Sequence, residues 1–198
     1  MKKTILVLVL IGLLSGLIVW AVTVALMPRT IMQRAYRRAT SVERVNERTL
    51  QAPVNQIAFA FGLYDADTDI GEVGASAPMA DMLYAQGWLD VTSEPMIFDV
   101  PDFGDRFFNI ALTDMQNLNT GYIGTRATGN QGGRYAVTWK EWEGSLPSGV
   151  TPVTVSTPRV NFWFRVFVAG PDDLTAADTI RRQVRLYPLS LLGAGSEP

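Results

Sequence analysis

Residues 96–113 read MIFDVPDFGDRFFNIALT, and this stretch decides the fold. Two short runs of branched and aromatic residues lie on either side of a Pro-Asp-Phe-Gly turn at residues 101–104. Short apolar runs separated by such turns are typical of β-strands, and the pattern extends from residue 53 to residue 168. The expected strands are residues 55–63, 82–90, 96–100, 106–113, 122–126, 134–139, 153–156 and 161–168. Many short strands at near-regular spacing predict an all-β domain, a sandwich or jelly-roll-like fold, with a barrel as the alternative.

One helix follows the strands. Asp172 or Asp173 is the expected N-cap, and arginines near residues 181–185 complement the negative end of the helix dipole. Its apolar stripe is Leu174, Ala177, Ile180 and Val184. The sequence therefore predicts an all-β domain that ends in one α-helix.

A long uncharged segment precedes the domain, at residues 4–27. At about 1.5 Å per residue its 24 residues would span roughly 36 Å, more than the roughly 30 Å of a bilayer's hydrocarbon core. A cleaved signal peptide would have a shorter apolar run and a small-x-small cleavage site, so a retained transmembrane helix is the prediction. Gly12 and Gly16 have the GxxxG spacing that allows a homodimer, although small residues are also common in membrane helices that do not associate.

Residues 30–50 alternate apolar residues with arginines at helical spacing, which predicts a basic amphipathic helix. A stalk with a solvated face is the preferred interpretation, with a lipid-surface helix or a partner helix as alternatives. The predicted organisation is a transmembrane anchor at 1–27, a stalk helix at 28–52, a β-rich domain at 53–192 and a flexible tail at 193–198.

Charge and composition exclude several kinds of function. Residues 1–50 hold eight basic and two acidic side chains, whereas residues 51–198 hold nine basic and 17 acidic ones. An acidic domain argues against nucleic acid as a partner, because phosphate backbones are bound by clustered Lys and Arg. The chain has no His and no Cys, which excludes a thiolate nucleophile, a His general base and a Cys/His zinc site. No cofactor is predicted.

Acid–base chemistry without His or Cys would need carboxylates. The candidates are Asp81 and Asp114, with Tyr84 near the first and Arg126 as an anion or oxyanion stabiliser; Asp90 is a further acid beside a predicted strand. The structural alternative, which we prefer, is that these groups pair with arginines or satisfy backbone N–H groups at strand ends.

Two loops have features of ligand sites, and each also has a commoner structural explanation. Asp65, Asp67 and Asp69 alternate as at the start of a calcium loop, but Gly71 comes one position late and a solvated acidic loop is the commoner case. The glycine-rich run at 124–133 offers N–H groups for an anion, although hairpin turns explain the same glycines. Aromatic residues on the strands either line a cleft or, more commonly, fill a core or interface; they are Trp88, Trp139, Trp142, Phe162, Trp163 and Phe164.

A series of short motifs in order resembles the bacterial domain of unknown function 1254 family. They are PMADMLY at 78–84, WLD at 88–90, VPD at 100–102, GDR at 104–106, IGTRATGN at 123–130, LPSGV at 146–150, GPDDL at 170–174 and LYPLS at 186–190. The resemblance covers residues 73–190 and implies an all-β domain that is exported or membrane-attached. Members of this family usually have Asn, Thr and Ser where this chain has Met79, Met82 and Ala85, which puts a ligand role of that motif in doubt.

The resemblance also implies a partner. In longer members a second β domain, the family of unknown function 1214, follows in the same chain, and nothing after Ser190 is expected to supply it here. We therefore predict a membrane-anchored binding or assembly module that joins a companion chain in the cell envelope. The alternative is a hydrolase-like enzyme that uses Asp81, Asp114 and Arg126.

The expected location is the bacterial inner membrane, with one crossing and a periplasmic domain. The short lysine-led N-terminus favours this orientation, whereas the arginines that follow the apolar segment favour a cytoplasmic domain.

Overall fold

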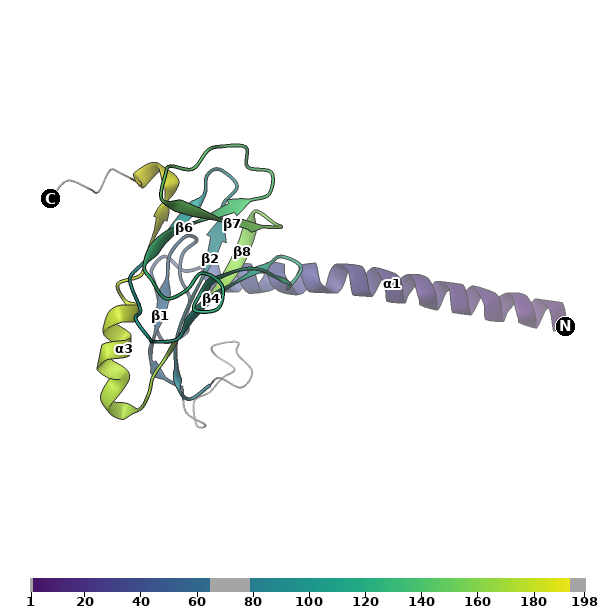
Figure 1. The fold of residues 1–198 in the computed structure, drawn as a ribbon. Helices are drawn as coiled ribbons and strands as arrows, with labels where there is room; N and C mark the ends of the chain where they lie inside the picture. The colour runs from purple at the N-terminus through teal and green to yellow at the C-terminus, as the bar shows by residue number, and fades with distance from the viewer. Residues whose placement is uncertain (1, 65–78, 193–198) are drawn as a thin grey trace.

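Two β-sheets pack face to face beside a long N-terminal helix in this computed structural model, which describes residues 2–64 and 79–192 (Figure 1). The first sheet has the strand order β1-β2-β8-β4-β5. Its strands are β1 (Ala58–Leu63), β2 (Met82–Asp90), β8 (Arg159–Phe167), β4 (Phe108–Asp114) and β5 (Asn119–Gly124). The second sheet has the order β7-β6-β3-β9, with strands β7 (Val150–Val155), β6 (Gly133–Trp139), β3 (Met96–Val100) and β9 (Arg185–Pro188). The fold is thus the predicted β-sandwich.

All eight predicted strands are present, with ends shifted by up to three residues. The predictions for 82–90 and 96–100 are confirmed residue for residue. A ninth strand, β9, was not expected; it has four residues, ends in proline, and is held by antiparallel pairing with β3.

The main core lies between the two sheets. Side chains alternate along each strand, so every second residue of β2, β8 and β4 points to the other sheet. Phe98 of β3 meets Phe162 of β8 edge to face at 5.1 Å, and Phe103 stacks on Phe108 at 4.1 Å. Phe162 and Phe164 are fully buried here, which confirms the core interpretation for these two aromatics.

The opposite face of the first sheet carries a second, smaller apolar cluster. It contains Met82 and Tyr84 of β2 together with Leu50 and Ala52 from the segment that follows the N-terminal helix. This face is therefore covered by the N-terminal part of the chain and not by a sheet.

A short helix closes one side of the sandwich. The 3-10 turn η1 (Pro171–Asp173) leads into α3 (Leu174–Arg181), whose Ala177 joins the main core; a second 3-10 turn, η2 (Leu189–Leu191), follows β9. The predicted N-cap is corrected: Asp173 occupies that position but makes no side-chain bond to the helix N–H groups. Its carboxylate instead forms a two-pronged ion pair with Arg106 and accepts a hydrogen bond from the Ala169 N–H.

The Arg106–Asp173 pair makes stability depend on pH. The Arg106 guanidinium and the Ala169 N–H hold the pKa of Asp173 well below its ordinary value. A lowered pKa means that the pair stabilises the fold above about pH 4 and that this contribution is lost as the pH falls further. We expect Asp173→Asn to lower the free energy of unfolding at pH 7 more than at pH 2.5, measured by denaturation at both pH values. Asp172→Asn, at an exposed neighbour, is the control; an equal loss at both pH values for Asp173→Asn would contradict the assignment.

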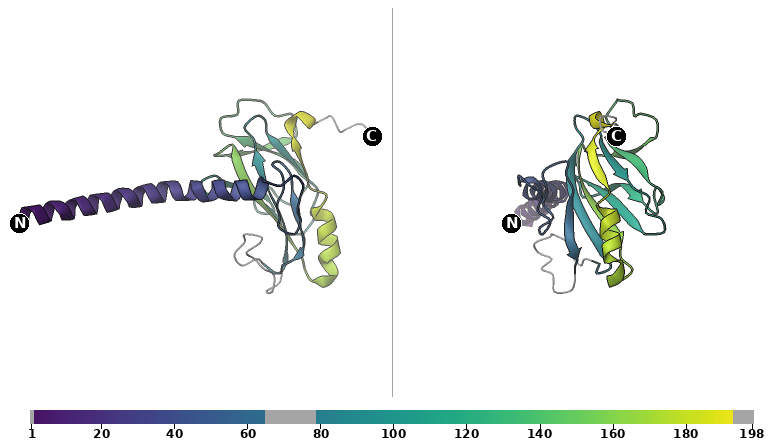
Figure 2. Two further views of the ribbon diagram at one scale, coloured as in Figure 1. Left: turned by 180° about the vertical axis from the view of Figure 1, so that it is seen from behind. Right: turned by 90° about the vertical axis from the view of Figure 1, so that its left-hand side faces the viewer.

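The N-terminal helix α1 (Lys2–Thr40) is continuous through Pro28, and its first part projects away from the sandwich (Figures 1 and 2). The prediction of a helix to residue 50 is wrong beyond Thr40. The chain turns back because Gln51 caps the helix end: its side-chain amide donates to the Arg38 carbonyl, and the Ala52 N–H donates to the Ala39 carbonyl. This turn places Leu50 and Ala52 on the sheet, where burial of their apolar surface favours it. The predicted tail at 193–198 lies outside the described residues.

Candidate functional site

A cavity lies between the C-terminal part of α1 and the outer face of β2, β8 and β4. It has a volume of about 460 Å³, and we call it the helix–sheet groove. The residues that give it its chemical character are Arg34, Arg38, Gln86, Trp88, Asn161 and Trp163.

The floor of the groove is made by polar and aromatic side chains of the sheet. Gln86 and Trp88 alternate on β2, and Asn161 and Trp163 alternate on β8, so all four share the face away from the main core. Gln86 and Asn161 are only 8% and 6% exposed. The Gln86 amide donates to the Leu50 carbonyl at 2.7 Å and the Asn161 amide donates to the Gly87 carbonyl at 3.0 Å, which fixes both side chains. The floor is therefore polar and aromatic, with its two amides held by backbone hydrogen bonds.

The roof of the groove is the basic part of α1. Arg34 and Arg38 line it, whereas none of its described lining residues is acidic. The helix is fixed here by Tyr36, whose ring meets Trp88 edge to face at 5.3 Å, and by Arg159, whose guanidinium lies 5.3 Å from the Tyr36 ring centre. The groove is therefore a site of positive charge within an otherwise acidic domain.

A second cavity of about 370 Å³ lies further toward the apolar end of α1. Arg29 and Gln33 line it, together with residues of the turns after β2, β4 and β7 such as Met115 and Thr157. Arg159 also contributes; it is paired with Asp90 at 2.9 Å. Burial of the Asp90 carboxyl favours a higher pKa, but hydrogen bonds from Thr92 and Arg159 outweigh burial, so the pKa of Asp90 is lowered. Asp90 is thus held as a charged structural partner of Arg159.

The carboxylate of Asp114 is hydrogen-bonded to two backbone N–H groups and one hydroxyl. One oxygen of its buried carboxylate accepts hydrogen bonds from the N–H groups of Gln116 and Leu118, and the other accepts from the Ser156 hydroxyl. These bonds hold the β4–β5 turn and tie it to the end of β7. This is the structural role that the sequence favoured for the candidate acids.

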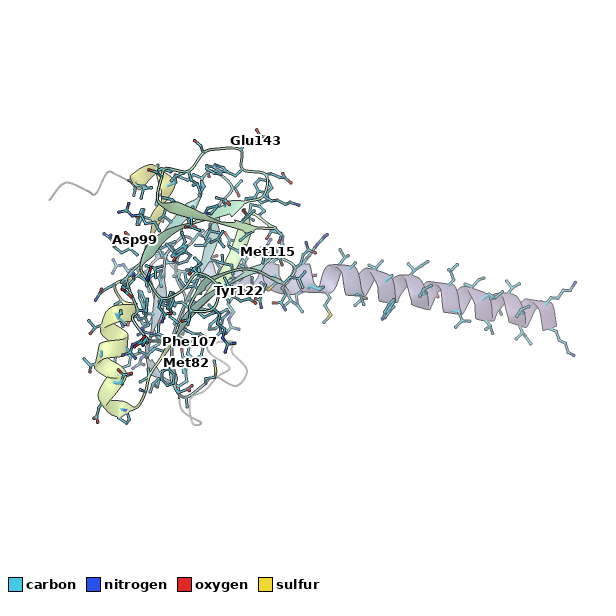
Figure 3. The ribbon with its side chains drawn as sticks, viewed as in Figure 1. Met82, Asp99, Phe107, Met115, Tyr122 and Glu143 are labelled. Carbon is cyan, nitrogen blue, oxygen red and sulfur yellow. The ribbon has the colours of Figure 1, made fainter. Side chains whose placement is uncertain are left out.

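Asp81 and Asp114 are not brought together. Met82 pairs with Phe167 at one end of β8, whereas Asp114 pairs with Val160 at the other end, seven residues away or roughly 23 Å. Figure 3 shows the chain neighbours of the two acids, Met82 and Met115, in different parts of the domain, with Met115 beside α1. A shared pocket, which the hydrolase alternative requires, is not formed by this geometry.

The other two candidates lie nearer to Asp81 than to Asp114. Tyr84 is buried on the outer face, and its hydroxyl accepts a hydrogen bond from the Met79 N–H. Arg126 is exposed just after Gly124, which is opposite Asn109 near the start of β4. Asp81 itself is exposed, and its carbonyl accepts from the Val168 N–H. Among the described residues, nothing places these three groups around one reacting atom.

Two of the three residues that depart from the family motif, Met82 and Ala85, pack in apolar clusters. Ala85 is fully buried in the main core, Met82 belongs to the outer apolar cluster, and Met79 is 45% exposed. Polar side chains at the first two of these positions would face apolar neighbours, so the apolar residues suit their surroundings.

Within the described residues, the structure assigns no ligand site to the predicted loops. Asp65, Asp67 and Asp69 lie outside the described residues, and within residues 2–64 and 79–192 no three acidic side chains come close enough to hold a metal ion. The run at 124–133 forms turns: Gly124 has a φ of +139°, and its N–H donates to the Thr128 hydroxyl.

The groove residues Gln86, Asn161, Arg34 and Arg38 were not among the sequence candidates. Gln86 and Asn161 are amides on strands that are otherwise mostly apolar. The alternation of side chains along a strand predicts that neither amide faces the main core. Arg34 and Arg38 lie opposite these two amides only because the chain turns back after Thr40, and the sequence does not predict that turn.

Comparisons with known proteins place the chain in a defined context. A family model described as protein of unknown function (DUF1254) matches residues 54–188. The VPA0106 protein from Vibrio parahaemolyticus is 28% identical, with a TM-score of 0.56, over 61% of this chain and 31% of that chain. An uncharacterized protein from Burkholderia cenocepacia is 16% identical, with a TM-score of 0.42, over 69% of this chain and 36% of that one. The chain thus spans about a third of the length of the solved relatives it matches, and among curated proteins none matches it.

Proposed function

Since this chain belongs to the family described as protein of unknown function (DUF1254), we propose that it is a membrane-anchored β-sandwich module that assembles with a companion chain in the cell envelope. The observation that carries the proposal is the match to only 31% of the VPA0106 chain. In that relative the matched part is joined to further chain, and the proposed companion is the counterpart of that further chain. The expected companion is a second β domain of the kind that the resemblance implied.

Helix α1 is the proposed anchor. It is long and apolar enough to cross a membrane, and its apolar part is exposed and makes no contact with the sandwich. Exposure of so much apolar surface is unfavourable in water but favourable in lipid. We place the chain in the inner membrane of a bacterium with the domain in the periplasm. Gly12 and Gly16 have open space around them and remain a proposed contact for a second copy of the helix.

Assembly is favoured over hydrolysis for a geometric reason. The carboxylates that would serve as acid and base lie at opposite ends of β8, and Asp114 is already bonded to two N–H groups and a hydroxyl. A module without a convergent acid–base pair can still present surfaces to a partner.

Phe61 is the proposed contact point for the companion. It lies on β1, an edge strand of the first sheet, and 87% of it is exposed, more than any other large apolar side chain that the structure describes. Exposed aromatic residues are frequent anchors of protein interfaces, and an edge strand also offers unpaired backbone groups.

The test is to purify the full chain from its own membrane in mild detergent and to identify bound proteins by mass. We expect a stoichiometric companion with a second β domain. Recovery of the chain alone, folded and monomeric, would overturn the assembly proposal. Release of the chain from membranes by carbonate would separately overturn the anchor.

Phe61→Ser is expected to reduce recovery of the companion at least tenfold while changing the free energy of unfolding by less than about 0.5 kcal/mol, because the side chain is exposed in the isolated chain. The control is Tyr122→Ser, at an exposed aromatic on β5, the opposite edge of the same sheet. Equal losses for both variants would show that the β1 edge is not the contact.

A further inference from the structure

The helix–sheet groove has the charge of a phosphate site. Arg34 and Arg38 form its roof, and none of its described lining residues is acidic. Within the described residues neither arginine is paired with a carboxylate, whereas Arg159 and Arg182 of the domain are. Arginine binds phosphate oxygens through a planar fork of N–H donors, so two unpaired arginines over one cavity favour a phosphate ester.

The floor of the groove has groups for the rest of such a ligand. Gln86 and Asn161 are more than nine-tenths buried, and they face the cavity from positions fixed by backbone hydrogen bonds. Amides of this kind suit hydroxyl and ester oxygens. Trp88 and Trp163 add rings that combine an apolar face with an N–H, a character that suits the boundary between lipid and water.

The position of the groove along α1 favours a membrane lipid as the source of the phosphate. Its first lining residue on α1, Ile31, comes four residues after Met27, the end of the apolar segment, which is about 6 Å along the helix. The polar layer of a bilayer is roughly 5–8 Å thick on each side of the hydrocarbon. The near end of the groove therefore lies at headgroup level when α1 crosses the membrane. Arg34 and Arg38 begin about 10 and 16 Å along the helix from Met27, and side chains on a helix lean toward its N-terminus, which is here toward the headgroups. Ile31 and Met32 give that end an apolar wall that suits the glycerol and the first part of an acyl chain.

We infer that the helix–sheet groove binds the headgroup of one anionic phospholipid, with the phosphate held by Arg34 and Arg38 and the polar headgroup atoms held by Gln86 and Asn161. The inference rests on the proposed membrane anchor, because only an anchored helix brings the groove to the lipid. It does not depend on the companion chain.

The test uses the full chain in micelles of a neutral detergent and short-chain lipids that dissolve as monomers. Native mass spectrometry counts bound dihexanoyl-phosphatidylglycerol against dihexanoyl-phosphatidylcholine, and a titration gives both affinities. We expect one molecule of the anionic lipid per chain, bound at least about tenfold more tightly than the zwitterionic one. Because the assay is done in micelles, it succeeds or fails independently of the companion; flotation of the full chain with vesicles reports separately on the anchor.

The double variant Arg34→Gln with Arg38→Gln should weaken binding of the anionic lipid by about tenfold or more, the loss of at least one charge-assisted bond. The matched control is Arg37→Gln with Arg44→Gln, which removes the same charge from exposed residues that do not line the groove. We expect it to bind as the unaltered chain does.

Three results would overturn the inference. Equal weakening by the control pair would mean diffuse attraction to the basic segment. Equal affinity for the two lipids would mean that the groove does not distinguish an anionic headgroup from a zwitterionic one. Binding of glycerol 3-phosphate as tightly as the lipid would make a free phosphate ester, and not a membrane lipid, the ligand.

Discussion

Replacement of Arg181 by leucine is expected to lower the free energy of unfolding by about 3 kcal/mol. Arg181 is fully buried, and its guanidinium donates to the carbonyls of Tyr84 at 2.6 Å and Ala60 at 3.0 Å, so it joins α3 to β2 and β1. Burial lowers the pKa of Arg181, an effect that the neighbouring Asp178 opposes. Leucine would leave both carbonyls without a donor in the interior. The loss falls at the low end for a buried charge because Asp178 is partly exposed and keeps Arg182 as a partner.

The measurement is chemical denaturation of the full chain in neutral detergent, followed by tryptophan fluorescence. Arg182→Leu is the control: Arg182 is partly exposed and pairs with Glu47 and Asp178 at the surface, so its loss should cost less than about 1 kcal/mol. Similar losses for the two variants would show that burial of Arg181 is not what makes it important.

Gly87→Ala is expected to cost about 3 kcal/mol. Gly87 lies in the middle of β2, and a methyl group there would come within 2.2 Å of the Gln56 carbonyl oxygen and 2.7 Å of the Phe162 ring. The carbonyl belongs to the segment that crosses the strand, where the Asn55 N–H donates to the Trp88 carbonyl at 2.8 Å. Backbone cannot yield as a long side chain can, so either this crossing or the packing of Phe162 must shift.

Gly62→Ala provides the comparison on the neighbouring strand. Nothing lies within 4 Å of an added methyl group at Gly62, so alanine there should be neutral or stabilise by up to about 0.5 kcal/mol through the unfolded state. The same denaturation assay measures both. A small effect of Gly87→Ala would mean that the crossing segment packs less closely on β2 than the structure has it.

The strands were predictable because each is a short apolar run bounded by turn residues, and such local signals need no knowledge of the rest of the chain. Strand β9 could not be predicted, because four residues ending in proline have no strand signal of their own. They are extended because they pair with β3 at the edge of the second sheet. The end of α1 at Thr40 escaped for a similar reason, since the residues after it keep helical spacing and are turned aside by contacts with the sheet.

The candidate site was less predictable than the fold. Asp114 and Asp90 were correctly interpreted as groups satisfied by their surroundings, because acids beside strand ends usually find N–H groups or arginines there. The groove could not be predicted, because its roof and floor come from segments about 50 to 125 residues apart. The sequence predicts only that Arg181 complements the C-terminal end of the helix dipole; that it is buried depends on how α3 docks on β1 and β2.

The unbroken course of α1 from Lys2 to Thr40 has a mechanical consequence. No hinge separates its apolar part, the proposed anchor, from the part held by Tyr36, Trp88 and Arg159, so the sandwich turns and tilts together with the helix. One residue inserted between the two parts would rotate the whole sandwich by about 100° about the helix axis and lift it by about 1.5 Å. With the proposed anchor, the direction that the domain faces over the membrane is therefore set by the number of residues between the apolar part of α1 and Tyr36.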